Sequence, residues 1–337
     1  MQKKNPAKRR PERLVVTLLS LLFLSTAVFA TVKYVFRAPE LDTDKPVVTP
    51  DGTASADVYR TDTDEPDAPG RTRRKYCYNI LVSGLDDDNG GSDTNILVRF
   101  DVPNKRIDLV SLPRDTLLHN EYRNNKLNFA YAKGGTELLM EQIENLLGVP
   151  VDFYVTVNLK GFIALVDQID GVDFDIPINM DYDDPYQDLH IHFTKGPRHL
   201  NGQEAMEVVR FRHNNDGTGY GTEDIGRIGT QQAFLKAVAK QLLQIGNVKN
   251  IPALVDIFCT YVKTDLTTGN LVWLGNEALN IGTENIHFAT LPGDGSGYYN
   301  KQSVYVLDAQ ATCDLVNEAL NPYNEALTLE DMDILVP

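Results

Sequence analysis

Positive charge is scarce in this sequence of 337 residues, which holds 32 Lys and Arg against 47 Asp and Glu and has a net charge of −15. Residues 1–37 contain eight of the basic residues and only one Glu, so the rest of the chain is more acidic still. Affinity for a nucleic acid comes mainly from cations that release the counterions condensed on it. The charge balance therefore excludes a general nucleic-acid-binding protein, and we expect no nucleic-acid partner.

Cysteine is scarce too, with Cys77, Cys259 and Cys313 alone and no Cys-x-x-Cys or Cys/His metal arrangement. This argues against thiol catalysis and against a structural zinc site of that type. Outside the cytoplasm a disulfide is permitted, and an odd count leaves one thiol over. We predict a Cys259–Cys313 disulfide because both residues lie in the C-terminal segment, while pairings with Cys77 stay open.

Long apolar runs are missing except for residues 14–32, which form an uncharged stretch of 19 residues. As a helix, such a stretch is just long enough to cross the hydrocarbon core of a bilayer. Six basic residues lie in residues 1–13, and such clusters stay in the cytoplasm. We therefore predict a single-pass protein of the cell membrane, with a cytoplasmic basic tail (1–13), a transmembrane anchor (14–32) and an extracytoplasmic remainder. A cleaved secretory signal is the alternative, because Val28-Phe29-Ala30 loosely resembles a cleavage site.

Residues 38–75 are rich in Pro, Asp and Thr and have almost no large apolar side chains. Such a composition cannot bury enough surface to fold, so we predict a disordered acidic linker that tethers the domain to the membrane. Arg71, Arg73, Arg74 and Lys75 form a basic patch at its end. This patch is either a solvated domain edge or a contact with anionic lipid headgroups.

Residues 76–325 alternate between short β-rich runs and longer helical periods, which predicts one folded domain. The interleaving favours an α/β layered sandwich with a central mixed β-sheet covered by helices on both faces. Alternating apolar residues predict strands, and apolar residues at helical spacing predict helices. The expected strands are 78–85, 95–101, 106–111, 151–157 and 172–176, and the expected helices are 136–147, 162–169 and 225–245.

Acidic residues flank a Gly-rich loop at the end of the first strand, in Gly84-Leu85-Asp86-Asp87-Asp88 and Ser92-Asp93-Thr94. Carboxylates on either side of a tight loop can converge on one hard cation, and magnesium prefers oxygen ligands. The alternative is a solvated acidic turn.

Three further polar clusters follow strand ends, at residues 111–116, 126–131 and 210–232. In an extended segment, Arg210 and Arg212 would point to one face and Phe211 to the other. On the following helix, Arg227 and Gln231 are four residues apart and share one surface, with Asp224 about one turn earlier. The rigid fork of Arg suits phosphate, so several converging Arg predict a ligand with at least two negative charges. Surface salt bridges would explain one such Arg, but they explain four near strand ends poorly.

The motifs GLD with SDT, SLPRDT, KLNFAYAKGG, VTVNLKGF, DGVDFDIP, HLNGQEAMEVVRFR and DIGRIGTQQ occur in this order. Together they resemble the LytR-CpsA-Psr family of Gram-positive cell-wall proteins, closely over residues 76–245 and more loosely over the tail. The resemblance implies a membrane-anchored phosphotransferase. Such an enzyme takes a glycopolymer (wall teichoic acid or capsular polysaccharide) from a polyprenyl pyrophosphate carrier, joins it to peptidoglycan through a phosphodiester and releases polyprenyl phosphate. The implied partners are the lipid-linked glycan, peptidoglycan and the membrane.

The same resemblance implies a role for each of the polar residues. Asp86 and Asp93 would hold Mg²⁺, and Asp115 and Asp224 would orient the arginines or take the proton from the sugar hydroxyl. The residues that would clasp the pyrophosphate are Arg114, Lys126, Arg210, Arg212, Arg227 and Gln231. Two rival functions are a protein that binds or hydrolyses polyprenyl pyrophosphate without transferring a polymer, and a transcription attenuator.

Some residues depart from the family pattern or stay undecided. Gly91 and Thr230 stand where members often carry an arginine. Leu139 and Ile143 could line a slot for the lipid or belong to the plain core. His190-x-His192 could bind a metal in an extended segment, but it has no third ligand at a convincing spacing, so we favour a solvated loop.

Overall fold

The computed structural model describes most of the chain after residue 70 and a few segments before it. The predicted tail (1–13) and anchor (14–32) lie outside the described residues. Within the part that is described, none of the helices combines the length and the apolar character needed to span a membrane. The described residues are 36–41, 47–48, 54–55, 71–85, 90–120, 122, 124–186, 188–221, 224–244, 256–258 and 260–336.

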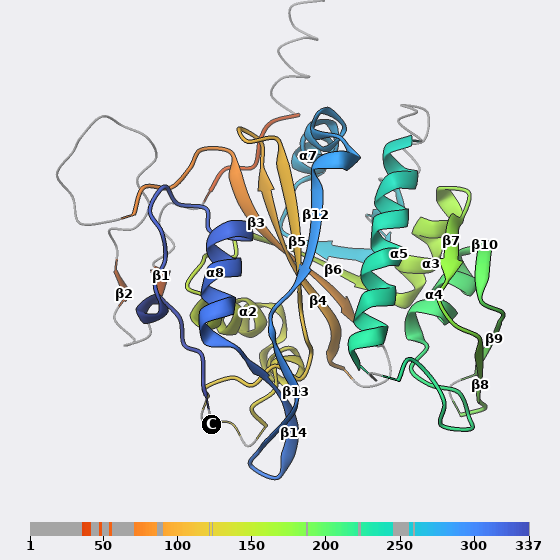
Figure 1. Cartoon of the computed structure of the whole chain (residues 1–337). Coiled ribbons are helices and arrows are strands. Elements are labelled where there is room, and N and C mark those ends of the chain that lie inside the picture. The colour runs from red at the N-terminus through yellow and green to blue at the C-terminus, as the bar shows by residue number, and fades with distance from the viewer. Residues whose placement is uncertain are drawn as a thin grey trace, which may run out of the picture.

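A six-stranded sheet in the order β11-β6-β3-β4-β5-β12 forms the centre of the molecule (Figure 1). Strand β3 pairs antiparallel with β4 and parallel with β6, and β5 pairs parallel with β12, so the sheet is mixed. The α/β class with a central mixed sheet is thus confirmed, as are the first three expected strands. The strands are β3 (Cys77–Leu85), β4 (Ser92–Asp101), β5 (Arg106–Leu112), β6 (Phe153–Asn158), β11 (Val262–Thr264) and β12 (Ile286–Thr290).

Helices pack on both faces of this sheet. Side chains alternate along a strand, so Leu81 and Leu97 lie in one core with α2 (Leu127–Leu147) and α8 (Ala309–Ala319). Tyr78 and Ile80 point the other way, into a second core with α7 (Thr268–Ile281). Leu139 and Ile143 are fully buried in the first core, so they are core residues and not part of a lipid slot.

Helix α2 is longer than the expected helix 136–147, because it begins at Leu127. The helical geometry is interrupted at Gly134 and Gly135, and Gly135 has a φ of 68°, which favours glycine. The expected helix is therefore the second part of α2. It ends at Gly148 in the left-handed conformation, whose N–H donates to the carbonyl of Glu144 over 2.8 Å.

A second group of elements lies beside the sheet (Figure 1). These elements pack around a third core, in which Phe174, Phe211 and Phe234 are buried. The sequence predicted α3, β7 and α5 of this group, but not its other strands or α4. The group comprises α3 (Leu159–Gln168), β7 (Val172–Ile176), β8 (Met180–Asp184), β9 (Leu189–Phe193), β10 (Gly196–Leu200), α4 (Gly202–Arg210) and α5 (Asp224–Gln244). Elsewhere in the chain lie β1 (Val47–Val48), which pairs with β2 (Ala54–Ser55), and β13 (Gly293–Tyr299), which pairs with β14 (Gln302–Leu307).

The described ends of the predicted linker belong to the folded body, which corrects the boundary at residue 76. Arg73 is only 2% exposed and pairs with Asp152, and the carbonyl of Pro39 accepts a hydrogen bond from the Tyr78 hydroxyl over 3.0 Å. At the other end, Met332 is buried beyond the predicted end at residue 325.

Three of the four cations in the basic patch at residues 71–75 form ion pairs within the domain, whereas Lys75 is exposed. Besides the buried pair of Arg73, Arg71 pairs with Asp331 over 2.6 Å and Arg74 with Asp101 over 2.5 Å. These cations therefore fasten the start of the domain to distant parts of the chain.

The expected Cys259–Cys313 disulfide involves Cys259, which lies outside the described residues. Cys313, on α8, is a free thiol in the first core, where its Sγ lies 3.6 Å from the carbonyl oxygen of Leu327. Cys77 is free and buried as well, and burial raises the pKa of its thiol to about 12. An unreactive structural role suits both described thiols.

Candidate functional site

A pocket of about 440 Å³ lies where β3 ends and β4 begins, between the sheet and helices α3, α4 and α5. This volume is in the range of small-molecule sites. Much of its wall is apolar, and it includes the aliphatic and aromatic side chains of Val82, Ile96, Val157, Leu159, Phe162, Leu165, Leu189, Phe234 and Leu235.

Three of the predicted arginines line this pocket: Arg210, Arg212 and Arg227. The expectation of an extended segment at 210–212 is wrong, because Arg210 is the last residue of α4 and only Phe211 and Arg212 leave the helix. Phe211 caps the helix with an extended backbone and is fully buried in the third core. This buried anchor fixes the exit of the chain from α4, so that Arg210 and Arg212 reach the same cavity.

Arg227 and Gln231 lie one turn apart on α5, and both line the pocket as their spacing predicted. Arg227 is only 6% exposed, and the Gln231 side-chain amide donates to the Val209 carbonyl over 3.0 Å. Gln231 therefore joins α5 to α4. Asp224 begins α5, but its side chain lies outside the described residues.

Asp93 connects the pocket to a second group of predicted residues. Its carboxylate accepts a hydrogen bond from Arg114 Nη1 over 2.8 Å and lies 3.7 Å from Arg212 Nη2. Asp115 lies next to this pair, with one oxygen 3.1 Å from Lys126 Nζ and the other 4.0 Å from Arg114 Nε. These contacts form a row of alternating charges that ends at the pocket wall. In order, the row is Lys126, Asp115, Arg114, Asp93 and Arg212.

Two aspartates were expected to hold magnesium, and one of them can be placed. Asp93 lines the pocket and is about one third exposed, whereas Asp86 lies outside the described residues. The hard carboxylate oxygens of Asp93 fit the ligand preference of Mg²⁺. The same carboxylate already contacts the guanidinium groups of Arg114 and Arg212.

The apolar half of the pocket is the part that sequence reasoning missed. Phe162 and Leu165 come from α3, Tyr182 and Leu189 from strands β8 and β9, and His213 follows Arg212. Phe162 and Leu165 are three residues apart, a spacing that places them on one helix face. That pattern marks an apolar face but does not tell a pocket wall from a core.

The comparisons with known proteins agree with the motifs. A model of the LytR_cpsA_psr family matches residues 48–321. The polyisoprenyl-teichoic acid–peptidoglycan teichoic acid transferase TagV of Bacillus subtilis is 31% identical over 252 residues, which cover 71% of this chain and 62% of TagV. The transferase TagU of Bacillus cereus is 32% identical over 244 residues, 71% of this chain and 76% of TagU.

Solved structures share the fold. The crystal structure of B. subtilis TagV superposes with a TM-score of 0.62 at 26% identity, over 78% of this chain and all (100%) of that chain. A structure of TagT bound to LI-WTA has a TM-score of 0.58 at 23% identity, over 74% of this chain and 92% of the other.

Proposed function

The chain belongs to the LytR-CpsA-Psr family, and we propose that it is a phosphotransferase of the cell envelope. It would take a glycopolymer of the teichoic acid or capsular polysaccharide type from polyprenyl pyrophosphate and attach it to peptidoglycan. In support, the relatives TagV and TagU are named as transferases of teichoic acid to peptidoglycan. The predicted anchor at residues 14–32 would hold the catalytic domain on the outer side of the membrane, beside its lipid substrate.

The convergence of Arg210, Arg212 and Arg227 on one pocket carries the proposal. The chain as a whole has a net charge of −15 and attracts anions poorly. Three guanidinium groups gathered in one pocket nevertheless make a strong local site for an anion. Each planar fork can donate two hydrogen bonds to phosphate oxygens without losing its charge. A pyrophosphate, with several negative oxygens in a short span, matches this arrangement.

The same pocket offers an apolar wall next to the arginines, which suits a lipid tail. Phe162, Leu165 and Leu235 line it on α3 and α5. A cavity of about 440 Å³ holds only the isoprene units nearest the headgroup, so the rest of the polyprenyl chain would stay in the bilayer. Burial of these units removes apolar surface from water, at about 25 cal/mol per Å².

The chemistry asks the protein to position groups and to neutralise charge. An acceptor hydroxyl of peptidoglycan attacks the phosphorus that bears the glycan, and the P–O bond to the second phosphate breaks. A phosphodiester forms, polyprenyl phosphate leaves with the electron pair of that bond, and the hydroxyl proton passes to a base. Arg114, Arg212 and Arg227 would stabilise the charge that grows on the equatorial and leaving oxygens.

Asp115 and Asp93 are placed to hold the cations in position. Asp115 contacts both Lys126 and Arg114, and Asp93 contacts Arg114 and lies near Arg212. These contacts support a positioning role for Asp115. Asp224, at the start of α5, is then our candidate for the base. Mg²⁺, held by Asp93 together with Asp86, would supply further charge neutralisation on the pyrophosphate.

The test is a transfer assay with the purified full chain, Mg²⁺ and a short glycan on polyprenyl pyrophosphate, with and without peptidoglycan oligomers. We expect a glycan–peptidoglycan product that Arg114→Ala and Arg212→Ala abolish. Loss of one such charge-stabilising donor lowers the rate by about 100-fold to 1,000-fold.

Arg198→Ala is the matched control, because Arg198 is half-exposed, pairs with Glu204 and lies outside this pocket. It should transfer at the wild-type rate. Release of free glycan phosphate without a peptidoglycan product would point to a pyrophosphatase instead, and full transfer by both Arg114→Ala and Arg212→Ala would refute the assigned roles.

A further inference from the structure

The hairpin of β8 and β9 has one apolar face and one face that carries only charged and titratable side chains. Strand residues alternate between faces, so Tyr182, Leu189 and Ile191 point inward, where Tyr182 and Leu189 line the pocket. Asp181, Asp183, His190 and His192 point outward and are exposed. The expected solvated loop at His190 and His192 is therefore a β-strand, and its side chains share one face.

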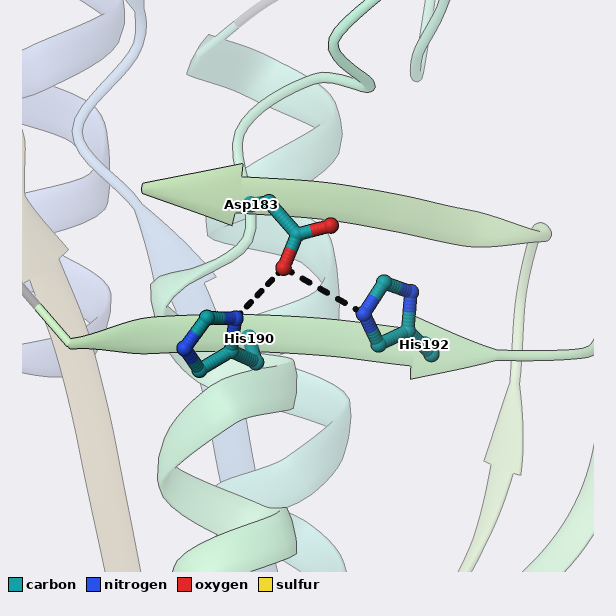
Figure 2. A group of neighbouring side chains, drawn as sticks. All are labelled: Asp183, His190 and His192. Atoms are coloured by element: carbon teal, nitrogen blue, oxygen red, sulfur yellow. Dashed lines mark hydrogen bonds and ion pairs between the residues drawn. The ribbon is translucent and has the colours of Figure 1, made fainter. Parts of the chain in front are cut away.

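The register of the hairpin supplies the third ligand that the sequence lacked. Asp183 pairs directly with His190 across the two strands. One oxygen of Asp183 lies 2.5 Å from His190 Nδ1 and 3.4 Å from His192 Nε2, so it bridges the two rings (Figure 2). One ligand atom from each of the three side chains falls within 4.8 Å of the others.

The outer ring nitrogens also have carboxylate partners. His192 Nδ1 lies 2.8 Å from Asp181, and His190 Nε2 lies 3.7 Å from Asp188. Histidines that bind a metal through one nitrogen usually donate the other N–H to a carboxylate, which fixes the orientation of the ring. Here both rings have such a partner on the side away from Asp183.

We propose that Asp183, His190 and His192 form a binding site for a divalent transition metal ion of the zinc class. Two imidazoles and a carboxylate are a common set of protein ligands for zinc, and water would complete the tetrahedron. Magnesium and calcium prefer oxygen ligands, so the site selects against them. It is separate from the pocket, and it does not depend on the proposed transfer reaction.

A metal at this site would stiffen the wall of the pocket. It would cross-link β8 and β9 on their outer face, while Tyr182 and Leu189 form the lining on the inner face. The backbone N–H groups of Asp181 and Asp183 already donate to the side chains of Asn214 and Asn215 over 2.7 Å. These two residues follow Arg212 in the chain, so the metal would also steady the segment that carries this arginine.

The competing interpretation is that His190 and His192 each form an ordinary exposed ion pair with an aspartate and bind no metal. The chain contains one such ordinary pair for comparison. His199 on β10 lies 2.8 Å from Asp173 on β7, in a similar exposed cross-strand pair, but no second histidine lies opposite. Among the described residues, the three around Asp183 are the only cluster with metal-ligand geometry.

The test is a titration of the full chain, purified without a polyhistidine tag, with Zn²⁺ alone and with Mg²⁺ alone by calorimetry. It is run at pH 8, because protons compete with the metal for imidazole. We expect one Zn²⁺ to bind per chain with no matching Mg²⁺ signal. His190→Ala and His192→Ala should each weaken binding by more than about tenfold, and Asp181→Ala by about tenfold, as a partner of a ligand.

His199→Ala is the matched control and should bind Zn²⁺ as tightly as the wild type. Hydrogen exchange provides a second readout, in which Zn²⁺ slows exchange of the β8 and β9 amides in the wild type but not in His192→Ala. The proposal is overturned if the wild type binds no Zn²⁺ in a one-to-one ratio, or if the His190, His192 and His199 variants all bind it alike.

Discussion

In the proposed function, the contacts of Asp93 prepare the pocket for an anionic ligand. One oxygen of Asp93 contacts Arg114 and the other lies near Arg212. These contacts hold the two arginine side chains at the pocket edge before any ligand binds. Such preorganisation lowers the entropy that binding must overcome. Phosphate oxygens would then take over the role of the carboxylate, with little movement of the arginines.

Gly91 provides a test of charge at this edge. A Cβ atom at Gly91 would meet only the Asn128 carbonyl oxygen, at an ordinary distance of 3.6 Å, and its backbone is not left-handed. Gly91→Arg should therefore fold and bring another cation beside Asp93. We expect binding of geranyl pyrophosphate to tighten by about tenfold, because hydrogen bonds to charged groups contribute roughly 1.5–3 kcal/mol before the ordering of the side chain is subtracted.

Calorimetry at fixed salt measures this change, and Gly91→Gln separates charge from size. Equal affinities of the Arg and Gln variants for the ligand would show that charge at this position does not reach the pocket.

Individual site residues were predictable to the extent that their geometry is local. The four-residue spacing of Arg227 and Gln231 placed both on one helix surface. The third ligand for His190 and His192 could not be read from spacing, because Asp183 meets them only through the register of the hairpin.

At the scale of elements, the segment at residues 71–74 works as a clamp between the start of β3 and the approach to β6. The carboxylate of Asp152 accepts hydrogen bonds from Arg73 and from the backbone N–H of Asn79, the latter over 2.7 Å. Arg73 also donates to the Cys77 carbonyl over 2.9 Å. Both members of the Arg73–Asp152 pair are almost fully buried. If one is removed, the remaining charged side chain cannot reach solvent.

Asp152→Ala should lower the free energy of unfolding by about 3–5 kcal/mol, since it leaves a buried charge without its counterion. Guanidinium unfolding followed by the fluorescence of Trp273, the single Trp of the chain, measures this loss. Glu40→Ala breaks the exposed pair with Arg37 and is the control, with an expected cost of about 0–1 kcal/mol. Equal losses in both variants would contradict the role of the clamp.

The elements that the sequence predicted include some with strong apolar periodicity, such as β7, whose buried and exposed residues alternate strictly, and α3. Two signals for missed elements were present: the alternation Leu-His-Ile-His-Phe at 189–193, and the capping box of Asn201 and Glu204 that begins α4. The start of α2 at Leu127 could not be predicted, because Gly134 and Gly135 interrupt the helical spacing of its apolar residues.

At the scale of the whole molecule, strand pairing brings distant residues together. Strand β12 lies beside β5, and Gln232 on α5 donates to the Ala289 carbonyl over 2.8 Å and to Thr290 Oγ1 over 2.7 Å on β12. The C-terminal part of the chain thus fixes α5, and with it Arg227, against the sheet that carries Asp93. Periodicity could not predict this arrangement, because it depends on pairings between remote segments.

The predicted orientation places the domain outside the cell. A reporter enzyme that works only outside the cytoplasm, fused after Pro337, should be active in cells, because the basic tail at residues 1–13 stays inside. A second reporter that works only in the cytoplasm, fused at the same point, is the control and should be inactive. The reverse pattern would place the domain in the cytoplasm, on the opposite side of the membrane from its proposed substrates.

The most direct measurement is a crystal structure of the protein with a short-chain polyprenyl pyrophosphate. We expect density for the phosphates among Arg210, Arg212 and Arg227, and for the isoprene units between Phe162 and Leu235. A lipid bound elsewhere, with its phosphates away from these arginines, would show that this pocket does not hold the lipid carrier.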